Sequence, residues 1–166
     1  MAQSEPARGE GLTVAESAEL SLERFYLKDL SFESPLAPEV FGERWQPNMQ
    51  VDINTRTQNL GDDRFEVVLT VTAQAKNPQG KTALIVEIQQ AGVFRVKGLD
   101  GPRLQRVLAT FCPNLLFPYV RETLDSLVVK GSFPALMLAP VNFDVLYEQA
   151  LRRNQANQAA KDPTQH

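Results

Sequence analysis

The spacing of apolar side chains changes once along the chain, and this change constrains the fold more than any other feature. Between residues 49 and 96 apolar residues recur at every second position, which is typical of strands with one buried face. From residue 101 onward they recur at positions i, i+3, i+4 and i+7, which indicates helices that bury one stripe. A run of strands followed by a run of helices predicts an α+β domain.

Two turns divide the alternating region into three predicted strands. The alternation covers residues 49–53, resumes at 65–71 after a turn at 59–63, and resumes again at 82–96 after Asn-Pro-Gln-Gly at 77–80. Turns this short join neighbouring antiparallel strands. We therefore expect these strands to form a meander.

An earlier strand is predicted at residues 22–32, with a long connection after it. Tyr26, Leu30 and Phe32 share one face with Lys28, and Phe25 and Leu27 occupy the other. Residues 33–44 carry Pro35, Pro38 and Gly42, which disfavour a continuing strand or a regular helix. This connection is long enough to cross a sheet.

The second half of the chain predicts helices interrupted by prolines. Leu104, Val107, Leu108 and Phe111 form a stripe after Gly101-Pro102, and Val120, Leu124, Leu127 and Val128 continue a similar stripe until Gly131. Pro113 is expected to stop or kink this region, which leaves either two helices or one long kinked helix. Asn142 can cap a last helix with Phe143, Leu146, Tyr147, Ala150 and Leu151 on one face.

The second face of the predicted sheet is partly apolar, because Val68 and Ile85 point away from the main apolar row. One layer of helices covers only one face of a sheet. We therefore expect another copy of the chain, or a ligand, to bury part of this second face.

Both ends of the sequence lack the large apolar side chains that a packed domain needs. Residues 1–20 are predicted to be a disordered leader and residues 154–166 a disordered tail, around a single domain at 21–153. No secretory signal is recognisable at the start, and no apolar run approaches the roughly 20 residues that cross a bilayer. We expect a soluble, cytoplasmic protein.

Charge and residue content argue against several classes of function. The chain has 17 basic and 20 acidic side chains and a net charge of −3, which disfavours nucleic acid as a partner. Cys112 is the single cysteine and His166 the single histidine, so neither a disulfide, a metal site nor a Cys/His catalytic pair is expected. Asp62 and Asp63 are better explained as residues that favour a turn than as a catalytic acid pair. No cofactor or enzymatic activity is predicted.

Several ordered motifs resemble the export chaperone SecB, over about residues 24–150. They are Tyr26-x-Lys28-Asp29-x-Ser31-Phe32-Glu33-x-Pro35, Trp45-Gln46-Pro47, Glu66-Val67-Val68-Leu69, Glu87-x-Gln89-Gln90, CPNLLFPYVRE at 112–122 and FPALMLAPVNFD at 133–144. The resemblance implies a four-stranded antiparallel sheet with a crossover connection after the first strand and two main C-terminal helices. It also implies a homotetramer built as a dimer of dimers.

The resemblance implies a function as well. The family binds unfolded precursor proteins, keeps them competent for export and delivers them to the translocase ATPase SecA, without catalysis of its own. It places SecA-binding positions at Asp29 and Glu33 on the first strand and at Ile85 and Glu87 on the fourth. A negative patch around an apolar centre suits a basic partner segment, although surface acids also simply favour solubility.

The same resemblance implies client-binding positions. Trp45 and Leu84 match them, and Met49, Val51, Ile53 and Tyr147 are further candidates. From composition alone, Trp45 is equally well explained as a core anchor. Leu84 stands where the family commonly has phenylalanine, and the tail carries only Asp162 as an acid where family tails are often acid-rich.

Two other hypotheses remain open from the sequence. A small-ligand-binding or catalytic α+β domain would need polar groups that converge in a pocket, and the apolar strand faces offer few. A purely structural oligomer would have no affinity for unfolded chains.

Overall fold

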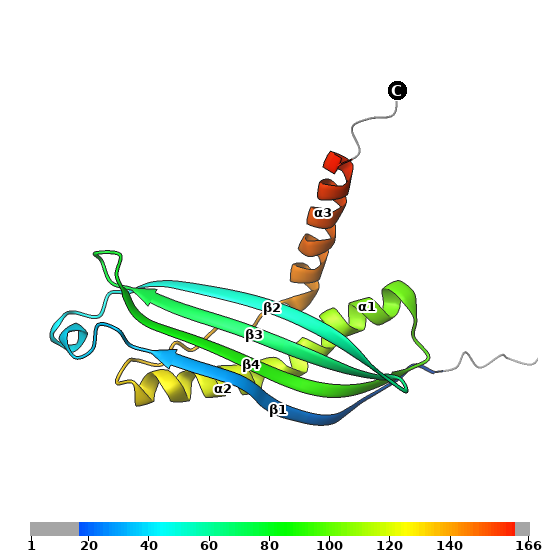
Figure 1. Cartoon of the computed structure of the whole chain (residues 1–166), viewed down its shortest axis with the longest axis horizontal. Helices are drawn as coiled ribbons and strands as arrows, with labels where there is room; N and C mark the ends of the chain where they lie inside the picture. The colour runs from blue at the N-terminus through cyan, green and yellow to red at the C-terminus, as the bar shows by residue number, and fades with distance from the viewer. Residues whose placement is uncertain (1–16, 162–166) are drawn as a thin grey trace, which may run out of the picture.

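The computed structural model describes residues 17–161, and it contains one antiparallel sheet with helices on one side (Figure 1). The strands are β1 (Glu19–Glu33), β2 (Asn48–Gly61), β3 (Arg64–Lys76) and β4 (Thr82–Lys97). The helices are α1 (Gly101–Ala109), α2 (Phe111–Lys130) and α3 (Phe143–Lys161), with a short 3-10 helix η1 (Glu39–Gly42) between β1 and β2.

The strand order is β1-β4-β3-β2, and every neighbouring pair is antiparallel. The predicted meander and the crossover are thereby confirmed: residues 34–47 carry the chain from one edge of the sheet to the other. The tight connection between β2 and β3 has positive φ angles at Asp62 (53°) and Asp63 (59°). Two central residues with positive φ match the right-handed twist of the flanking strands.

Strand β1 departs from the predicted alternation because it contains two register shifts, between Leu22 and Arg24 and between Leu27 and Asp29. Each bulge adds a residue and reverses which face the following side chains occupy. The prediction that Tyr26 shares a face with Leu30 and Phe32 is therefore wrong. Tyr26 lies on the helix-free face, while Leu30 and Phe32 pair with the core residues Ile88 and Val86.

The two predicted helical pieces are separate helices, and they meet at Thr110 rather than at Pro113. Thr110 leaves helical geometry (φ −122°, ψ −67°), and its hydroxyl donates to the carbonyl oxygen of Arg106. A proline ring clashes with the carbonyl four residues earlier in a continuous helix. With the break at Thr110, Pro113 falls in the first turn of α2, where N–H groups have no helical acceptor in any case.

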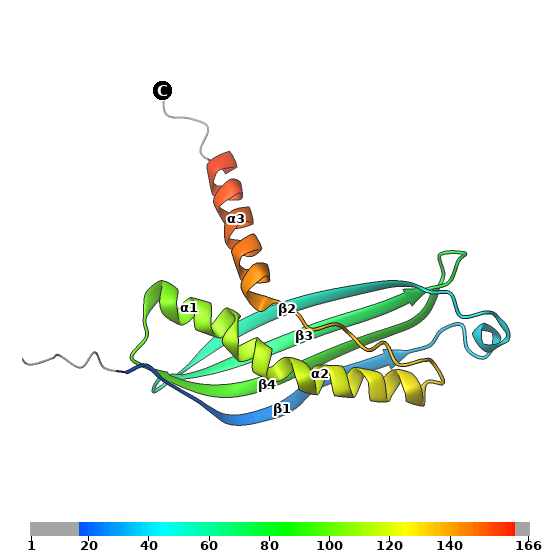
Figure 2. The same ribbon diagram turned by 180° about the vertical axis from the view of Figure 1, so that it is seen from behind.

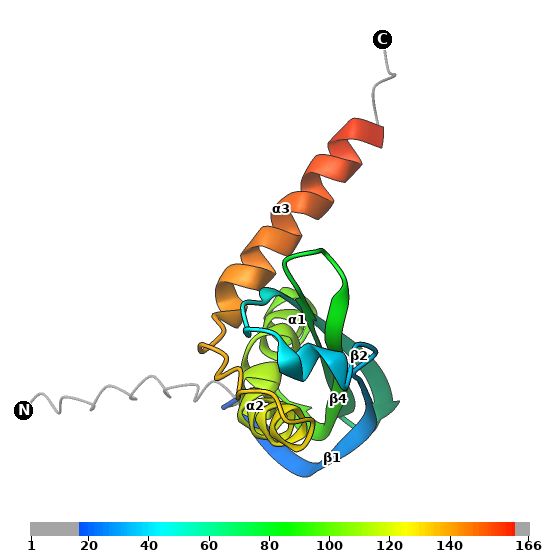
Figure 3. The ribbon, with the colours of Figure 1, turned by 90° about the vertical axis from the view of Figure 1, so that its left-hand side faces the viewer.

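Helix α2 lies across one face of the sheet and closes the core (Figures 2 and 3). Its buried stripe has a spacing of four residues and consists of Cys112, Leu116, Val120, Leu124 and Val128. Opposite it, Val67, Leu69 and Val71 of β3 and Val86 and Ile88 of β4 are fully buried. The core is thus one layer between α2 and the sheet.

Helix α3 projects away from this body and ends at Lys161, eight residues past the predicted end of the domain at 153 (Figure 3). The Asn142 side chain accepts a hydrogen bond from the N–H of Val145 (3.1 Å), as expected of a cap. Alanine, glutamine and lysine in the last turns favour helix, so a helix begun by this cap continues through them. Residues 1–16 of the predicted leader and 162–166 of the predicted tail lie outside the described residues.

Candidate binding surfaces

The helix-free face of the sheet brings the four predicted SecA-binding residues together. Glu33 of β1 pairs directly with Ile85 of β4, and Asp29 pairs with Gln89, two residues beyond Glu87. Paired residues in antiparallel strands share a face, so the carboxylates of Asp29, Glu33 and Glu87 lie on the same face as the half-buried Ile85. We call these four residues the acidic patch.

A further carboxylate, Asp52 of β2, stands in the same cross-strand row as the acidic patch. Asp52 pairs with Thr72, which pairs with Glu87, and the Thr72 hydroxyl donates to Glu87 (3.4 Å). The sequence analysis did not single out Asp52, although its place between Val51 and Ile53 put it on the polar side of β2.

The centre of the helix-free face is covered by the chain's own side chains. Tyr26 pairs with Ala91, and Ala91 pairs with Val68, both of which are buried. The Tyr26 hydroxyl donates to the Glu66 carboxylate, and Lys28 Nζ lies 2.7 Å from Glu66 Oε1. Val68 is therefore buried within the single chain, whereas Ile85, the other apolar residue of this face, is only half-buried. The expectation that another copy of the chain or a ligand covers part of this face stays a prediction.

This cross-strand network shifts the ionisation of its members. The hydrogen bonds from Lys28 and Tyr26 hold the pKa of Glu66 below its usual range. Burial, followed by the hydrogen bond to Glu66, raises the pKa of Tyr26 to about 12. Nearby, Glu23 bridges Arg64 and Arg95 at 2.8 and 2.7 Å, and the bonds to Arg95 and then Arg64 lower the Glu23 pKa. Around neutral pH the carboxylates of Glu66 and Glu23 are therefore ionised.

On the opposite face, three predicted client residues line up along β2. Met49, Val51 and Ile53 pair with Ala75, Ala73 and Val71 of the buried β3 face, so they point to the helix side. They are only partly covered, and Val51 is 36% exposed. Because β2 is at the edge of the sheet, one of its backbone edges has no neighbouring strand in the described residues.

An aromatic cluster lies where the crossover meets the end of α2. The Trp45 ring packs against Phe133 at 5.1 Å between centroids, and the exposed Phe41 packs against Phe133 at 5.4 Å. Trp45 is half-buried, so it both anchors the crossover to the core and presents part of its ring. The core-anchor explanation of Trp45 is thus supported by its packing, and its client-binding role stays a prediction.

Tyr147 of α3 separates two hollows beside β2. One, of about 230 Å³, includes Ile53, Leu146 and Ala150, and the other, of about 440 Å³, includes Phe65 and Leu108. Arg106 of α1 lies over the Tyr147 ring at 5.6 Å and bonds Glu148 (2.7 Å) and Asp144 (3.1 Å) of α3. Arg106 thereby fixes the side chain that divides the hollows.

Leu84 is not part of this surface. Its side chain has no exposed area and belongs to the core opposite α2. The prediction that Leu84 lines a surface channel is corrected by its burial, and we assign it to packing.

Helix α2 also carries an exposed apolar stripe. Phe111, Leu115 and Tyr119 follow one another at intervals of four residues and are all exposed, and Phe25 of β1 stacks on Tyr119 at 4.4 Å. Its four-residue spacing is visible in the sequence, and the stripe lies about 100° around the helix from the buried one. We call Phe25, Phe111, Leu115 and Tyr119 the α2 stripe.

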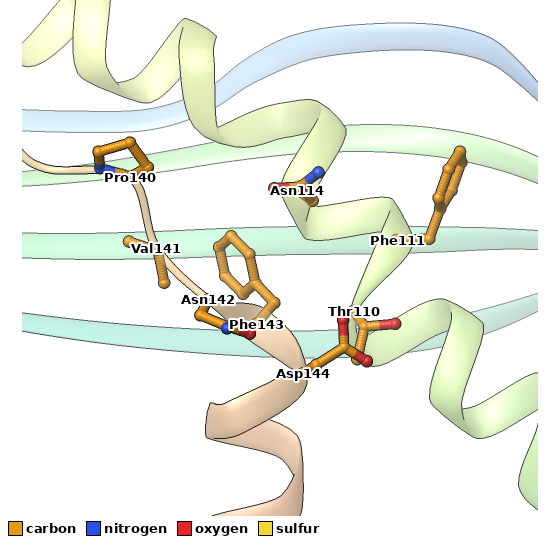
Figure 4. Close-up of a pocket in the computed structure, with 8 residues that line it drawn as sticks. All are labelled: Thr110, Phe111, Asn114, Pro140, Val141, Asn142, Phe143 and Asp144. Carbon is orange, nitrogen blue, oxygen red and sulfur yellow. The ribbon is translucent and has the colours of Figure 1, made fainter.

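Beside the start of α2 the chain encloses another hollow, of about 400 Å³ (Figure 4). Thr110, Phe111 and Asn114 line one side, and residues 140–144 line the other.

Burial raises the pKa of the nearby Cys112 thiol to about 12, so Cys112 is a packing residue and not a nucleophile. No helix within residues 17–161 has the length and apolar character to span a bilayer.

Comparisons with known proteins identify the family. Residues 13–154 match the family described as SecB, preprotein translocase subunit SecB. The chain is 52% identical over 154 residues to the protein-export protein SecB of Pseudomonas aeruginosa PAO1, covering 93% of this chain and 94% of that protein. It is 56% identical over 140 residues to the protein-export protein SecB of Hahella chejuensis, covering 84% and 87%.

A solved structure supports the fold. A SecB-like chaperone of Mycobacterium tuberculosis, in complex with a peptide from an antitoxin, has a TM-score of 0.62 and 17% identity, covering 74% of this chain and 91% of its own. The two proteins share their overall fold over the matched part of the chain. By sequence and by fold, the chain belongs to the SecB family of protein-export chaperones, and it is not an enzyme.

Proposed function

We propose that the protein is a cytoplasmic, ATP-independent chaperone that holds unfolded precursors and delivers them to SecA. The observation that carries this proposal is the separation of two unlike surfaces on one sheet. The partly covered apolar side chains of β2 point to the helix side, and the acidic patch lies on the opposite face. A client and a SecA segment can therefore bind at the same time.

Client binding is assigned to the surface from Trp45 along Met49, Val51 and Ile53 to Tyr147. Apolar contacts of this kind are unselective, so they favour any chain whose apolar groups are exposed over a folded one. The unpaired edge of β2 can add main-chain hydrogen bonds to an extended client. The protein should suppress aggregation of an unfolded precursor without added nucleotide, measured by light scattering. A native, folded version of the same precursor should not bind.

SecA binding is assigned to Asp29, Glu33, Ile85 and Glu87. Asp29→Lys with Glu87→Lys reverses two of the three charges, and we expect loss of SecA binding in calorimetry with client binding retained. Glu19→Lys, at the other end of β1, is the matched control and should bind SecA as the unaltered protein does. Unchanged SecA affinity in the double variant would contradict this assignment.

We assign an interface of the homotetramer, a dimer of dimers, to the α2 stripe. Four exposed apolar side chains form one contiguous row on β1 and α2. A contiguous exposed apolar surface of this kind is typical of a protein–protein interface. A tetramer has a mass of about four times 18.5 kDa, which light scattering after size exclusion measures directly.

A further inference from the structure

Residues 131–142, between α2 and α3, form a strap that runs back across the helix-covered side of the sheet beside α2 (Figure 2). Most of its large side chains pack into the core: Phe133, Leu136, Leu138 and Val141. Met137 is the exception. It is 78% exposed, more than any other large apolar side chain of the described residues, and its φ is +49°.

The backbone of the strap is held in this shape by side chains of α2. Asp125 Oδ1 accepts hydrogen bonds from the N–H groups of Leu136 (2.9 Å) and Met137 (3.1 Å). One turn earlier on the helix, Arg121 Nη1 donates to the carbonyl oxygen of Leu138 (3.5 Å). Two residues spaced i, i+4 on α2 therefore anchor three successive residues of the strap, and they impose the conformation of Met137.

This conformation is unfavourable for methionine. The left-handed region is readily adopted by glycine and by asparagine, but a Cβ with a long side chain raises the energy of that backbone. Met137 also adds little to the core, because most of its surface is exposed. A strained residue that does not contribute to packing points to a role outside the fold of the subunit.

The position of Met137 connects the two ends of the surface assigned to clients. The strap begins near Phe133, which packs on Trp45, and it ends at Phe143, beside the hollow that Tyr147 lines. A methionine side chain is flexible and polarisable, which suits contacts with apolar groups of varied shape.

We propose that Met137 is a client contact, which binds apolar side chains of an unfolded polypeptide, and that Asp125 is its positioning residue. This inference rests on the proposed chaperone function. It adds the strap to the binding surface, between the aromatic cluster and Tyr147.

Met137→Asn separates binding from stability, because asparagine fits the left-handed backbone and removes the apolar side chain. We expect the midpoint of thermal unfolding to stay equal or rise. The affinity for reduced, carboxymethylated α-lactalbumin, a permanently unfolded client, should fall by about three- to tenfold, as expected for the loss of one partly buried apolar side chain. Leu60→Asn, at an exposed leucine beside the β2–β3 turn, is the control and should leave the affinity unchanged.

Two further measurements test the roles of Met137 and Asp125. The sequence has three methionines, so methyl-labelled protein gives three signals, and the one absent from Met137→Asn belongs to Met137. That signal should shift when the unfolded client is added. Asp125→Ala should weaken client binding, while Asp125→Asn, whose amide oxygen still accepts both N–H groups, should restore it.

The outcomes separate this inference from the proposed function. If the unaltered protein fails to bind the unfolded client, the chaperone proposal fails and the role of Met137 with it. If the unaltered protein binds but Met137→Asn binds equally well and the methyl signal stays in place, Met137 is not a contact. A client affinity that is equally low in Asp125→Ala and Asp125→Asn would overturn the positioning role.

Discussion

At the scale of single residues, packing is tight where α2 crosses β4. A Cβ added at Gly92 would lie 2.8 Å from Phe94 Cε2 and 3.2 Å from both Leu116 Cδ2 and Leu22 Cδ1. These neighbours come from β4, α2 and β1, and all three are buried or half-buried. Glycine at this position is thus required by the close approach of three elements.

Gly92→Ala should therefore destabilise the protein. Overpacking of a dense core costs about 1–3 kcal/mol, and we expect the free energy of unfolding in urea to fall by that amount. Gly42→Ala is the matched control, since no atom lies within 4 Å of its added Cβ and its φ is not in the left-handed region. A Gly92→Ala protein as stable as Gly42→Ala would show that the neighbours give way without cost.

At the scale of elements, β1 depends on contacts that its bulges create. The two register shifts turn Tyr26 and Lys28 toward Glu66 of β3, across the intervening β4, so one carboxylate links β1 to β3. An unbroken alternation would have put Tyr26 on the same face as Leu30, away from Glu66. The bulges thus decide which polar side chains join the strands.

Glu66→Gln should weaken this connection in a pH-dependent way. The folded-state pKa of Glu66 is lowered, so its contribution is present above the unfolded pKa near 4.5 and is lost as the pH falls through the folded value. At pH 7 we expect the free energy of unfolding to fall by roughly 1 kcal/mol, the difference between a hydrogen bond to a charged acceptor and one to a neutral acceptor. The difference from the unaltered protein should shrink in acid, whereas the exposed Asp52→Asn should show little effect at either pH.

Helix α3 depends on Arg106 for its place beside α1. Arg106→Ala removes both ion pairs and the contact with the Tyr147 ring. Because these groups are exposed, we expect a local loosening and little change in global stability. Amide hydrogen exchange should become several-fold faster in the first turns of α3 and stay unchanged in the sheet. Arg103→Ala, an exposed arginine on the same helix, is the control; equal exchange in both variants would exclude a role for Arg106 in holding α3.

At the scale of the whole molecule, three surfaces of different character lie on the two faces of the sheet. The acidic patch occupies the helix-free face, the apolar side chains of β2 and the strap lie on the helix side, and the α2 stripe lies along β1 and α2. Each surface involves a different strand or helix face. If the subunits assemble through the α2 stripe as proposed, the other two surfaces stay available.

Leu115→Asp should disrupt assembly, because a carboxylate buried in an apolar interface loses its hydration without a partner. We expect the mass from light scattering to fall below about four times 18.5 kDa, with the far-ultraviolet circular dichroism of the subunit retained. Leu60→Asp is the matched control: Leu60 is 44% exposed and Leu115 38%, but Leu60 lies at the far hairpin. An intact tetramer in Leu115→Asp would place the interface elsewhere.

The amino-acid pattern alone predicted most of the local structure and the family. Alternation defined β2, β3 and β4 and their turns, the crossover followed from Pro35, Pro38 and Gly42, and Asn142 capped α3 as expected. These features depend on short-range preferences of the backbone and on which side of an element is apolar. Such preferences can be inferred from a single sequence.

The tertiary structure alone decided the features that depend on contacts between residues distant in the sequence. The bulges in β1 moved Tyr26 to the other face, burial against α2 removed Leu84 from the surface, and the break before α2 came at Thr110. Likewise, contacts from Asp125 hold Met137 outward, although both its neighbours in the sequence turn to the core. Periodicity in the sequence shows which side chains of an element share a face. The packing of elements that are distant in the sequence decides whether that face is buried or exposed.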